Sequence, residues 1–130
     1  MKLEEIRKVL DAEWFGGMVS RPDRGTREVR SCHASDLLSD VLTSSGVGSI
    51  LLTGLTNVQV VRVAELSDIV AVCFVRDKKP QPEVARLAED MEIPLLVTHL
   101  SMFESCGRLY AKGMPVANRV EKDAKCQRQK

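Results

Sequence analysis

Hydrophobic residues gather along the chain in short apolar runs, separated by stretches in which they recur at helical spacing. The clearest runs, residues 50–53, 69–75 and 95–98, are apolar almost throughout, as is typical of strands buried on both faces. Between them, the spacing predicts helices at about 57–66 and 83–91. Strands that alternate with helices indicate right-handed crossovers. We therefore predict a three-layer α/β/α fold with a mostly parallel sheet built from βαβ units, with these three strands in its interior.

The amino-terminal part has a weaker pattern. Apolar residues at helical spacing predict a first helix that begins near Leu3 and ends near Glu13. Residues 14–15 then form a short extended piece, and residues 28–32 form a weak strand. Ser35 has the position of an N-cap for the helix that follows.

The carboxyl-terminal part ends in a polar stretch. Ser101 is expected to cap a last helix that ends at Gly113. Beyond it the chain is rich in charged and amide side chains, with too few apolar residues to pack as core. We therefore predict one folded domain over 1–114 and a disordered polar tail over 115–130.

Length, charge and hydropathy narrow the class of protein. The 130 residues carry a formal net charge of +1, so no strong field attracts nucleic acid or an anionic membrane. No apolar run approaches the roughly 20 residues that cross a bilayer, and no signal peptide is visible. We expect a cytoplasmic protein that binds neither nucleic acid nor membrane.

The chemistry of the chain collects where the predicted strands end. In parallel α/β sheets, ligands bind beyond the carboxyl ends of the strands, where helix N-termini present free N–H groups. Both histidines fall in these segments, beside hydroxyls and cations. A small anionic ligand, such as a nucleotide or a metabolite, would suit this set. Hydroxyls there are also typical of ordinary helix N-caps, so a purely structural role remains an alternative. The candidate ligand-binding residues are His33, Ser35, Asp36, Thr53, Gly54, Arg76, Thr98, His99 and Ser101.

Catalytic and metal-binding patterns fit the chain poorly. It lacks the glycine-rich phosphate loops, the nucleophile elbow and the paired-histidine zinc motif. Cys32 and His33 are neighbours, so on a strand they would face opposite ways and could not act as a nucleophile and base. Asp36 and Asp40 have the spacing of one exposed helix face. We expect no catalytic residues, no metal and no cofactor. The cysteines at 32, 73, 106 and 126 lie far apart and are expected to be free thiols.

Several blocks resemble the DRTGG domain family, which is similar to the N-terminal domain of HPr kinase/phosphorylase. They are His-Ala-Ser-Asp-Leu-Leu-Ser-Asp-Val-Leu at 33–42, the strand 49–54, Ile-Pro-Leu-Leu-Val-Thr at 93–98 and Ser-Met-Phe-Glu at 101–104. The resemblance extends over residues 1–114. It implies a three-layer α/β/α domain that serves as a regulatory module, and it transfers no catalytic residues.

The chain departs from the pattern that gives this family its name. Gly54-Leu55-Thr56 stands where Asp-Arg would follow one strand, and Val75-Arg76-Asp77 stands where Thr-Gly-Gly would follow the next. A glycine pair lets a ligand approach the backbone closely, which Arg76 and Asp77 would obstruct. The fold is therefore the firmer part of the expectation, and a shared ligand does not follow from it.

We predict a non-enzymatic regulatory domain that senses a ligand or binds a partner protein and acts as a homodimer. The alternative from another class is a small phosphotransfer enzyme that uses His33 or His99; a pure scaffold is a third. The homodimer is expected because apolar residues exceed one buried stripe; the alternative is that a three-layer domain buries them internally. Val58, Val60, Val61 and Val63 crowd one helix, and Met102 and Phe103 are adjacent on another.

Overall fold

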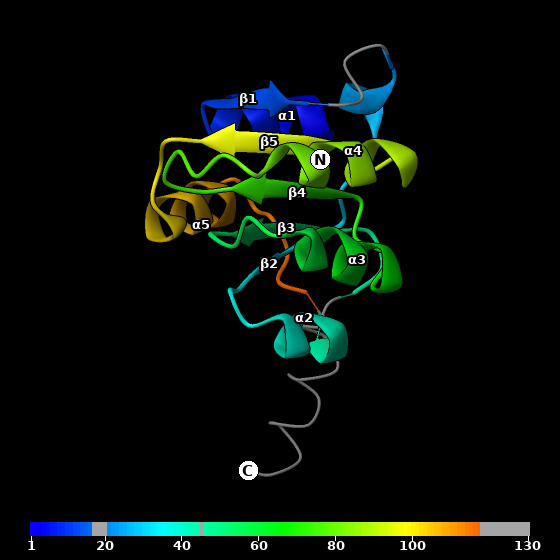
Figure 1. Cartoon of the computed structure of the whole chain (residues 1–130). Helices are drawn as coiled ribbons and strands as arrows, with labels where there is room; N and C mark the ends of the chain where they lie inside the picture. Colours follow the sequence, from blue (N-terminus) through cyan, green and yellow to red (C-terminus); the bar gives the residue numbers. More distant parts are fainter. Residues whose placement is uncertain (17–20, 45, 118–130) are drawn as a thin grey trace, which may run out of the picture.

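A five-stranded sheet forms the centre of the computed structural model, which describes residues 1–16, 21–44 and 46–117. The strand order is β1-β5-β4-β3-β2 (Figure 1). Four strands are parallel, and β1 pairs antiparallel with β5. The predicted parallel sheet and its three interior strands are confirmed. The strands are β1 (Ala12–Phe15), β2 (Ser31–Ala34), β3 (Ser49–Thr53), β4 (Ala71–Phe74) and β5 (Leu95–Thr98).

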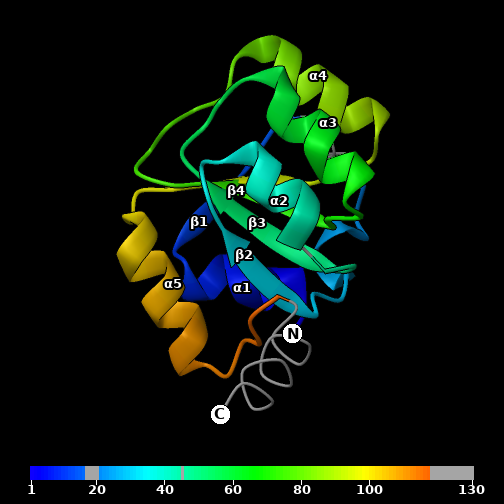
Figure 2. The ribbon, with the colours of Figure 1, turned by 90° about the horizontal axis from the view of Figure 1, so that it is seen from below.

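Helices cover both faces of the sheet, which confirms the three-layer α/β/α architecture. The connections from β2 to β5 always step to the next strand, so right-handed crossovers place their helices on one face. These are α2 (Leu38–Ser44), α3 (Val58–Leu66) and α4 (Pro82–Asp90). The other face is covered by α1 (Leu3–Val9) and α5 (Met102–Ala111), as Figure 2 shows. A short 3₁₀ turn, η1, spans Arg24–Thr26.

The strands are buried on both faces because successive side chains alternate between two cores. Ile50 and Leu52 pack with α1 and α5, whereas Leu51 packs with α2, α3 and α4. All three side chains are fully buried. Burial of such side chains stabilises the fold by about 1.5–3 kcal/mol each. The continuous apolar runs in the sequence therefore reflect a middle layer that lies between two helical layers.

The first helix is shorter than its hydrophobic spacing predicts. It ends at Val9, and Asp11 then adopts a left-handed backbone with φ +51°. The chain reverses there, and Ala12 pairs with Thr98 of β5. The end predicted near Glu13 is wrong because β1 pairs with the open edge of β5. The free energy of this pairing is not reflected in the helical periodicity of the sequence.

The weak strand and the helix after it are both shifted from their predicted places. The strand is Ser31–Ala34 rather than 28–32, because Ser31 pairs in register with Ser49. Helix α2 begins at Leu38, so Ser35 is not its N-cap. Instead the Ser35 hydroxyl accepts a hydrogen bond from the Leu37 N–H at 3.0 Å and closes a local turn.

The valines of α3 are covered within the domain. Val60, Val61 and Val63 are all buried between α3 and its neighbours, and Val58 packs against the same core. A helix that crosses a sheet beside two other helices buries more than one narrow stripe. The expectation that these valines pair two copies of the chain is therefore wrong, whereas Phe103 on α5 is exposed.

The segment after α5 runs back along the open edge of β2. The Cys32 N–H donates to the Pro115 carbonyl at 3.0 Å, and the Ala117 N–H donates to the Cys32 carbonyl at 3.3 Å. Met114 and Ala117 are buried. Of the predicted tail, residues 118–130 lie outside the described residues. In the part of the chain that is described, no helix is long and apolar enough to cross a membrane.

Candidate functional site

The carboxyl ends of β2 to β5 meet along one edge of the sheet, which we call the rim. The candidate residues predicted from the sequence lie in or directly after these strands, as expected for parallel strands. Asp36, which follows β2, bonds to Thr53 and Gly54 at the end of β3, whereas Arg76, Thr98, His99 and Ser101 lie at or after the ends of β4 and β5.

Asp36 connects the loops that follow β2 and β3. Its Oδ1 atom accepts hydrogen bonds from the Thr53 hydroxyl at 2.9 Å and from the Gly54 N–H at 2.7 Å. The Leu55 N–H donates in turn to the Thr53 hydroxyl oxygen at 3.2 Å. The donors that an anionic ligand would use at the end of β3 are thus occupied by a carboxylate of the chain itself. These residues form a latch, which we call the Asp36 latch.

His33 is held beneath α2. Its Nε2 atom lies 3.2 Å from Oδ2 of Asp40, and its side chain is only 11% exposed. Cys32 packs on the opposite face of the sheet with α1 and α5, as the alternation along a strand predicts. Asp36 and Asp40 therefore have different partners and do not form one acidic face.

The turn after β4 has a backbone that favours glycine. Arg76 and Asp77 have φ values of +60° and +56°, in the left-handed region. The Arg76 N–H donates to the Leu100 carbonyl and the Asp77 N–H to the Thr98 carbonyl, both at 2.8 Å. Left-handed backbone costs a residue with a Cβ atom roughly 1–2 kcal/mol. The chain thus keeps a conformation suited to the Gly-Gly pair of the family pattern while it places two charged side chains there.

The hydroxyls at the end of β5 have structural partners. The Thr98 hydroxyl donates to the Leu10 carbonyl at 2.6 Å and accepts from the Leu100 N–H at 3.2 Å. Ser101 is the N-cap of α5, and its hydroxyl accepts from the Glu104 N–H at 3.1 Å. Thr98 therefore joins α1 to the rim, and Ser101 ties the beginning of α5 to it.

A polar hollow of about 490 Å³ opens at this end of the rim, between β1, β5 and the loop after β4. Its size falls within the range of small-molecule sites, roughly 300–1,000 Å³. His99 is the only one of the predicted candidates in its wall, and its Nδ1 atom lies 3.8 Å from Oδ2 of Asp11. The charged and aromatic residues that line it include Arg7, Asp11, Glu13, Trp14, Phe15, Asp77 and Lys79.

Most of these lining residues escape prediction because they come from α1, β1 and the turn between them, which join the sheet from the far end of the sequence. The antiparallel pairing with β5 brings Ala12 and Glu13 beside the carboxyl end of that strand. The Arg24 guanidinium covers the Trp14 ring, 4.2 Å from its centroid. Arg7 donates to both carboxylate oxygens of Glu4, and this hydrogen bond lowers the pKa of the Glu4 carboxyl. The sequence did contain one signal for this hollow: the loop after β4 is rich in cations, among them Arg76 and Lys79.

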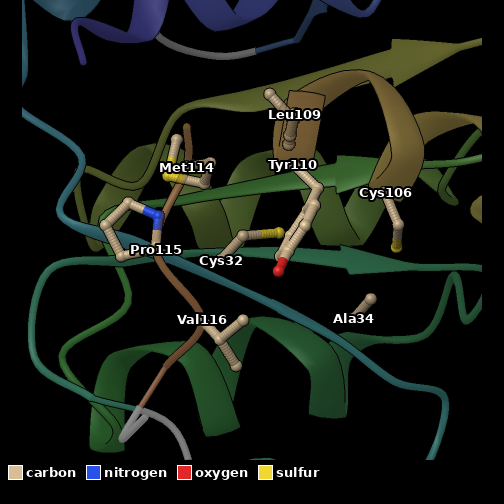
Figure 3. A pocket seen from close by; sticks show the side chains of 8 residues that line it. All are labelled: Cys32, Ala34, Cys106, Leu109, Tyr110, Met114, Pro115 and Val116. Carbon is tan, nitrogen blue, oxygen red and sulfur yellow. The ribbon is translucent and has the colours of Figure 1, made fainter. Parts of the chain in front are cut away.

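A second, apolar pocket of about 210 Å³ lies away from the rim, between β2, α5 and residues 114–116 (Figure 3). Cys32, Cys106 and Tyr110 are among the residues that line it. Burial raises the pKa of the Cys32 thiol to about 12, with a further contribution from Cys106, and burial also raises the pKa of Cys106. Both thiols are therefore neutral and poor nucleophiles near neutral pH.

Neither hollow has the ligands of a metal centre. Among residues 1–16, 21–44 and 46–117, no three histidine, cysteine or acidic side chains gather where they could hold a metal ion. The wall of the polar hollow combines cationic and carboxylate side chains.

Comparison with known proteins finds no family model and no curated protein that matches the sequence. Among solved structures, the CBS and DRTGG domains of the regulatory region of Clostridium perfringens pyrophosphatase, complexed with the activator diadenosine tetraphosphate, are similar. The TM-score is 0.64 at 18% identity, and the match covers 88% of this chain and 48% of the other. This chain thus spans about half of that structure, and the likeness concerns the fold. It supports the resemblance to DRTGG domains.

Proposed function

We propose that the chain is a regulatory domain that senses a small anionic ligand, a nucleotide, in the polar hollow at the rim. The observation that carries the proposal is the composition of that hollow. Lys79 and His99 offer donors to phosphate oxygens, and the carboxylates of Glu13 and Asp77 offer acceptors to ribose hydroxyls. Carboxylates bind ribose in this way in other α/β domains.

The rest of the predicted candidate set has a supporting part in this proposal. The Asp36 latch fixes the neighbouring loops, and Thr98 and Ser101 link the hollow to α1 and α5. His33, Ser35 and Gly54 then shape the rim rather than contact the ligand. Arg76 is exposed beside the hollow and adds positive charge for a phosphate.

The structural neighbour supports a regulatory role. It is the regulatory region of an enzyme, and it is complexed with a nucleotide activator. By analogy, the proposed ligand of this chain carries phosphate and a purine base.

Differential scanning fluorimetry tests the proposal with AMP, ADP, ATP and diadenosine tetraphosphate, each compared with adenosine and with inorganic phosphate. A ligand at 100 times its dissociation constant adds about 2.7 kcal/mol of stability. For a domain of this size we expect the melting temperature to rise by several degrees. We expect Lys79→Ala and His99→Ala each to weaken nucleotide binding about tenfold, since each removes one contact to phosphate.

Glu65→Ala is the matched control, because Glu65 is an exposed charged residue of α3 on a different side of the domain. It should leave the nucleotide response unchanged. If no nucleotide shifts the melting temperature at millimolar concentration, or if Lys79→Ala and His99→Ala leave the shift intact, the proposal is wrong.

The phosphotransfer alternative rests on the accessibility of the His99 side chain. Its side chain is exposed and pairs with Asp11, whereas His33 is shielded by α2. Intact mass spectrometry after incubation with acetyl phosphate and with ATP distinguishes the two functions. A phosphorylated protein that disappears in His99→Ala would favour the enzyme, and reversible binding without modification favours the sensor.

We further propose that the domain acts as a homodimer, because a small domain needs a second copy or a partner protein to transmit the effect of ligand binding. Because the α3 valines are buried within the domain, we consider α5 as the surface through which two copies pair. Helix α5 begins at Met102, after its N-cap Ser101, and Ser101 lies two residues after His99 of the hollow.

A further inference from the structure

The outer face of α5, which we call the α5 crest, is apolar and uncovered. Phe103 is 89% exposed and Tyr110 is 66% exposed. Gly107 and Ala111 are exposed between and beside them. Residues three, four and seven apart lie on one side of a helix, so these side chains form a single stripe. A contiguous apolar stripe, unlike a single exposed apolar residue, indicates a surface that another molecule covers.

Gly107 makes the middle of the crest flat. It lies within the helix, where glycine costs about 0.5–1 kcal/mol relative to alanine. A Cβ atom at this position would meet nothing within 4 Å. The packing of the domain itself therefore gives no reason for a glycine. A reason would be the close approach of a second helix, since the absence of a side chain lets two backbones come together.

The apolar pocket beside the crest has room for an aromatic ring. Its volume is about 210 Å³, and a cavity of roughly 150 Å³ with apolar walls is large enough to bind benzene. Tyr110 belongs both to the crest and to the wall of the pocket, so the two surfaces are continuous (Figure 3). Phe103 lies one turn before Gly107, and Tyr110 lies about one turn after it.

The charged residues that flank the crest can pair with the same residues of a second copy of the chain. Glu104 and Arg108 form an ion pair at 2.8 Å within the helix, and both side chains are about half exposed. In two antiparallel copies of α5 related by a twofold axis near Gly107, Glu104 of one copy faces Arg108 of the other. The same axis sets Phe103 opposite Tyr110. A parallel pairing would instead place like charges together.

We infer that two copies of this chain pair through antiparallel α5 helices that cross at Gly107, with Phe103 of each copy inserted into the apolar pocket of the other. The inference rests on the proposed homodimer and assigns it a surface. Because Ser101 caps α5 at the rim and Phe103 follows in its first turn, ligand binding beside His99 and pairing at the crest act on the same helix.

Sedimentation velocity of the full chain tests the pairing. The unaltered chain is expected at twice its mass of 14.4 kDa at micromolar concentration. Phe103→Glu should raise the dimer dissociation constant about 100-fold, because it places a charge in an apolar pocket. Gly107→Leu should raise it at least about tenfold by holding the helices apart. Neither change should harm the monomer, since Phe103 is exposed and the space over Gly107 is empty.

Leu66→Glu is the matched control. Leu66 is 70% exposed on α3, on the opposite face of the sheet, and its substitution should leave the dimer intact. Circular dichroism and thermal melts show that each variant is folded. Exchange of the flanking charges adds a second test: Glu104→Arg should weaken the dimer, and the addition of Arg108→Glu should restore it.

Two outcomes of the sedimentation experiments decide between the proposals. A monomeric unaltered chain would overturn both this interface and the homodimer. A dimer that survives Phe103→Glu and Gly107→Leu would overturn the α5 interface alone. Nucleotide binding is measured separately on the folded Phe103→Glu variant, so a failed interface and a failed nucleotide site give different results.

Discussion

The buried hydroxyl of Ser105 illustrates how single polar atoms affect this small domain. Its side chain is fully buried in α5 and has no hydrogen-bond partner among the described residues. An unpaired buried polar group costs about 1–3 kcal/mol. Ser101, one turn earlier, makes the opposite contribution, because its hydroxyl caps the helix.

We predict that Ser105→Ala raises the free energy of unfolding by about 1 kcal/mol, since alanine removes the unpaired hydroxyl and favours helix. Ser101→Ala should lower it by about 1 kcal/mol through loss of the N-cap. Urea denaturation measures both. A loss of stability in Ser105→Ala would mean that the hydroxyl has a partner, such as a bound water.

The left-handed turn after β4 allows a second prediction at the residue scale. Arg76→Gly should raise the free energy of unfolding by up to about 1 kcal/mol, because glycine adopts φ +60° without strain. Gly113→Ala is the converse: its φ is +89° and no atom lies near a new Cβ, so only backbone strain would destabilise it, by about 1 kcal/mol. Equal responses of the two variants would refute this account.

At the scale of elements, the Asp36 latch joins two βα loops that the sheet alone would leave separate. Hydrogen bonds to a charged group contribute about 1.5–3 kcal/mol each when sheltered, and less when exposed. Asp36 is exposed, so the lower end of the range applies.

We predict that Asp36→Ala lowers the free energy of unfolding by about 1–2 kcal/mol and speeds hydrogen exchange of the Gly54 N–H. The matched control is Asp90→Ala on α4, an exposed carboxylate for which the structure shows no hydrogen bond among the described residues. Unchanged exchange at Gly54 in Asp36→Ala would show that the latch does not hold this loop.

At the scale of the whole molecule, two cores enclose a sheet that contains buried thiols. Burial raises the pKa of Cys32 to about 12 from an ordinary value of 9.0, and that of Cys73 is raised as well. The folded state therefore holds these protons more tightly than the unfolded chain. The stability that they contribute is complete below pH 9 and is lost as the pH rises toward 12.

We predict a fall in the free energy of unfolding between pH 9 and about 12, of up to about 1.4 kcal/mol per pH unit for each buried thiol. Cys32→Ala should make this slope shallower, whatever it does to stability at neutral pH. Denaturation at several pH values measures the slope. An identical slope in the variant would mean that Cys32 does not titrate on unfolding.

The layers and the interior of the sheet could be predicted from the order of the residues alone. Continuous apolar runs such as 69–75 predict strands that are buried on both faces, and helices between them require parallel pairing. The same topology placed His33, Thr53 and His99 along one rim, because parallel strands end on the same side.

The boundaries of the elements and the lining of the hollows depend on contacts between segments that are distant in the sequence. Asp11 ends α1 early because Ala12 finds a partner in Thr98, 86 residues later in the chain. The same pairing carries Ala12 and Glu13 to the rim, and the return of residues 114–117 along β2 forms the apolar pocket. Local periodicity records whether a side chain is buried. It does not record which distant segment buries it, so pairing between the ends of the chain becomes visible only in the folded molecule.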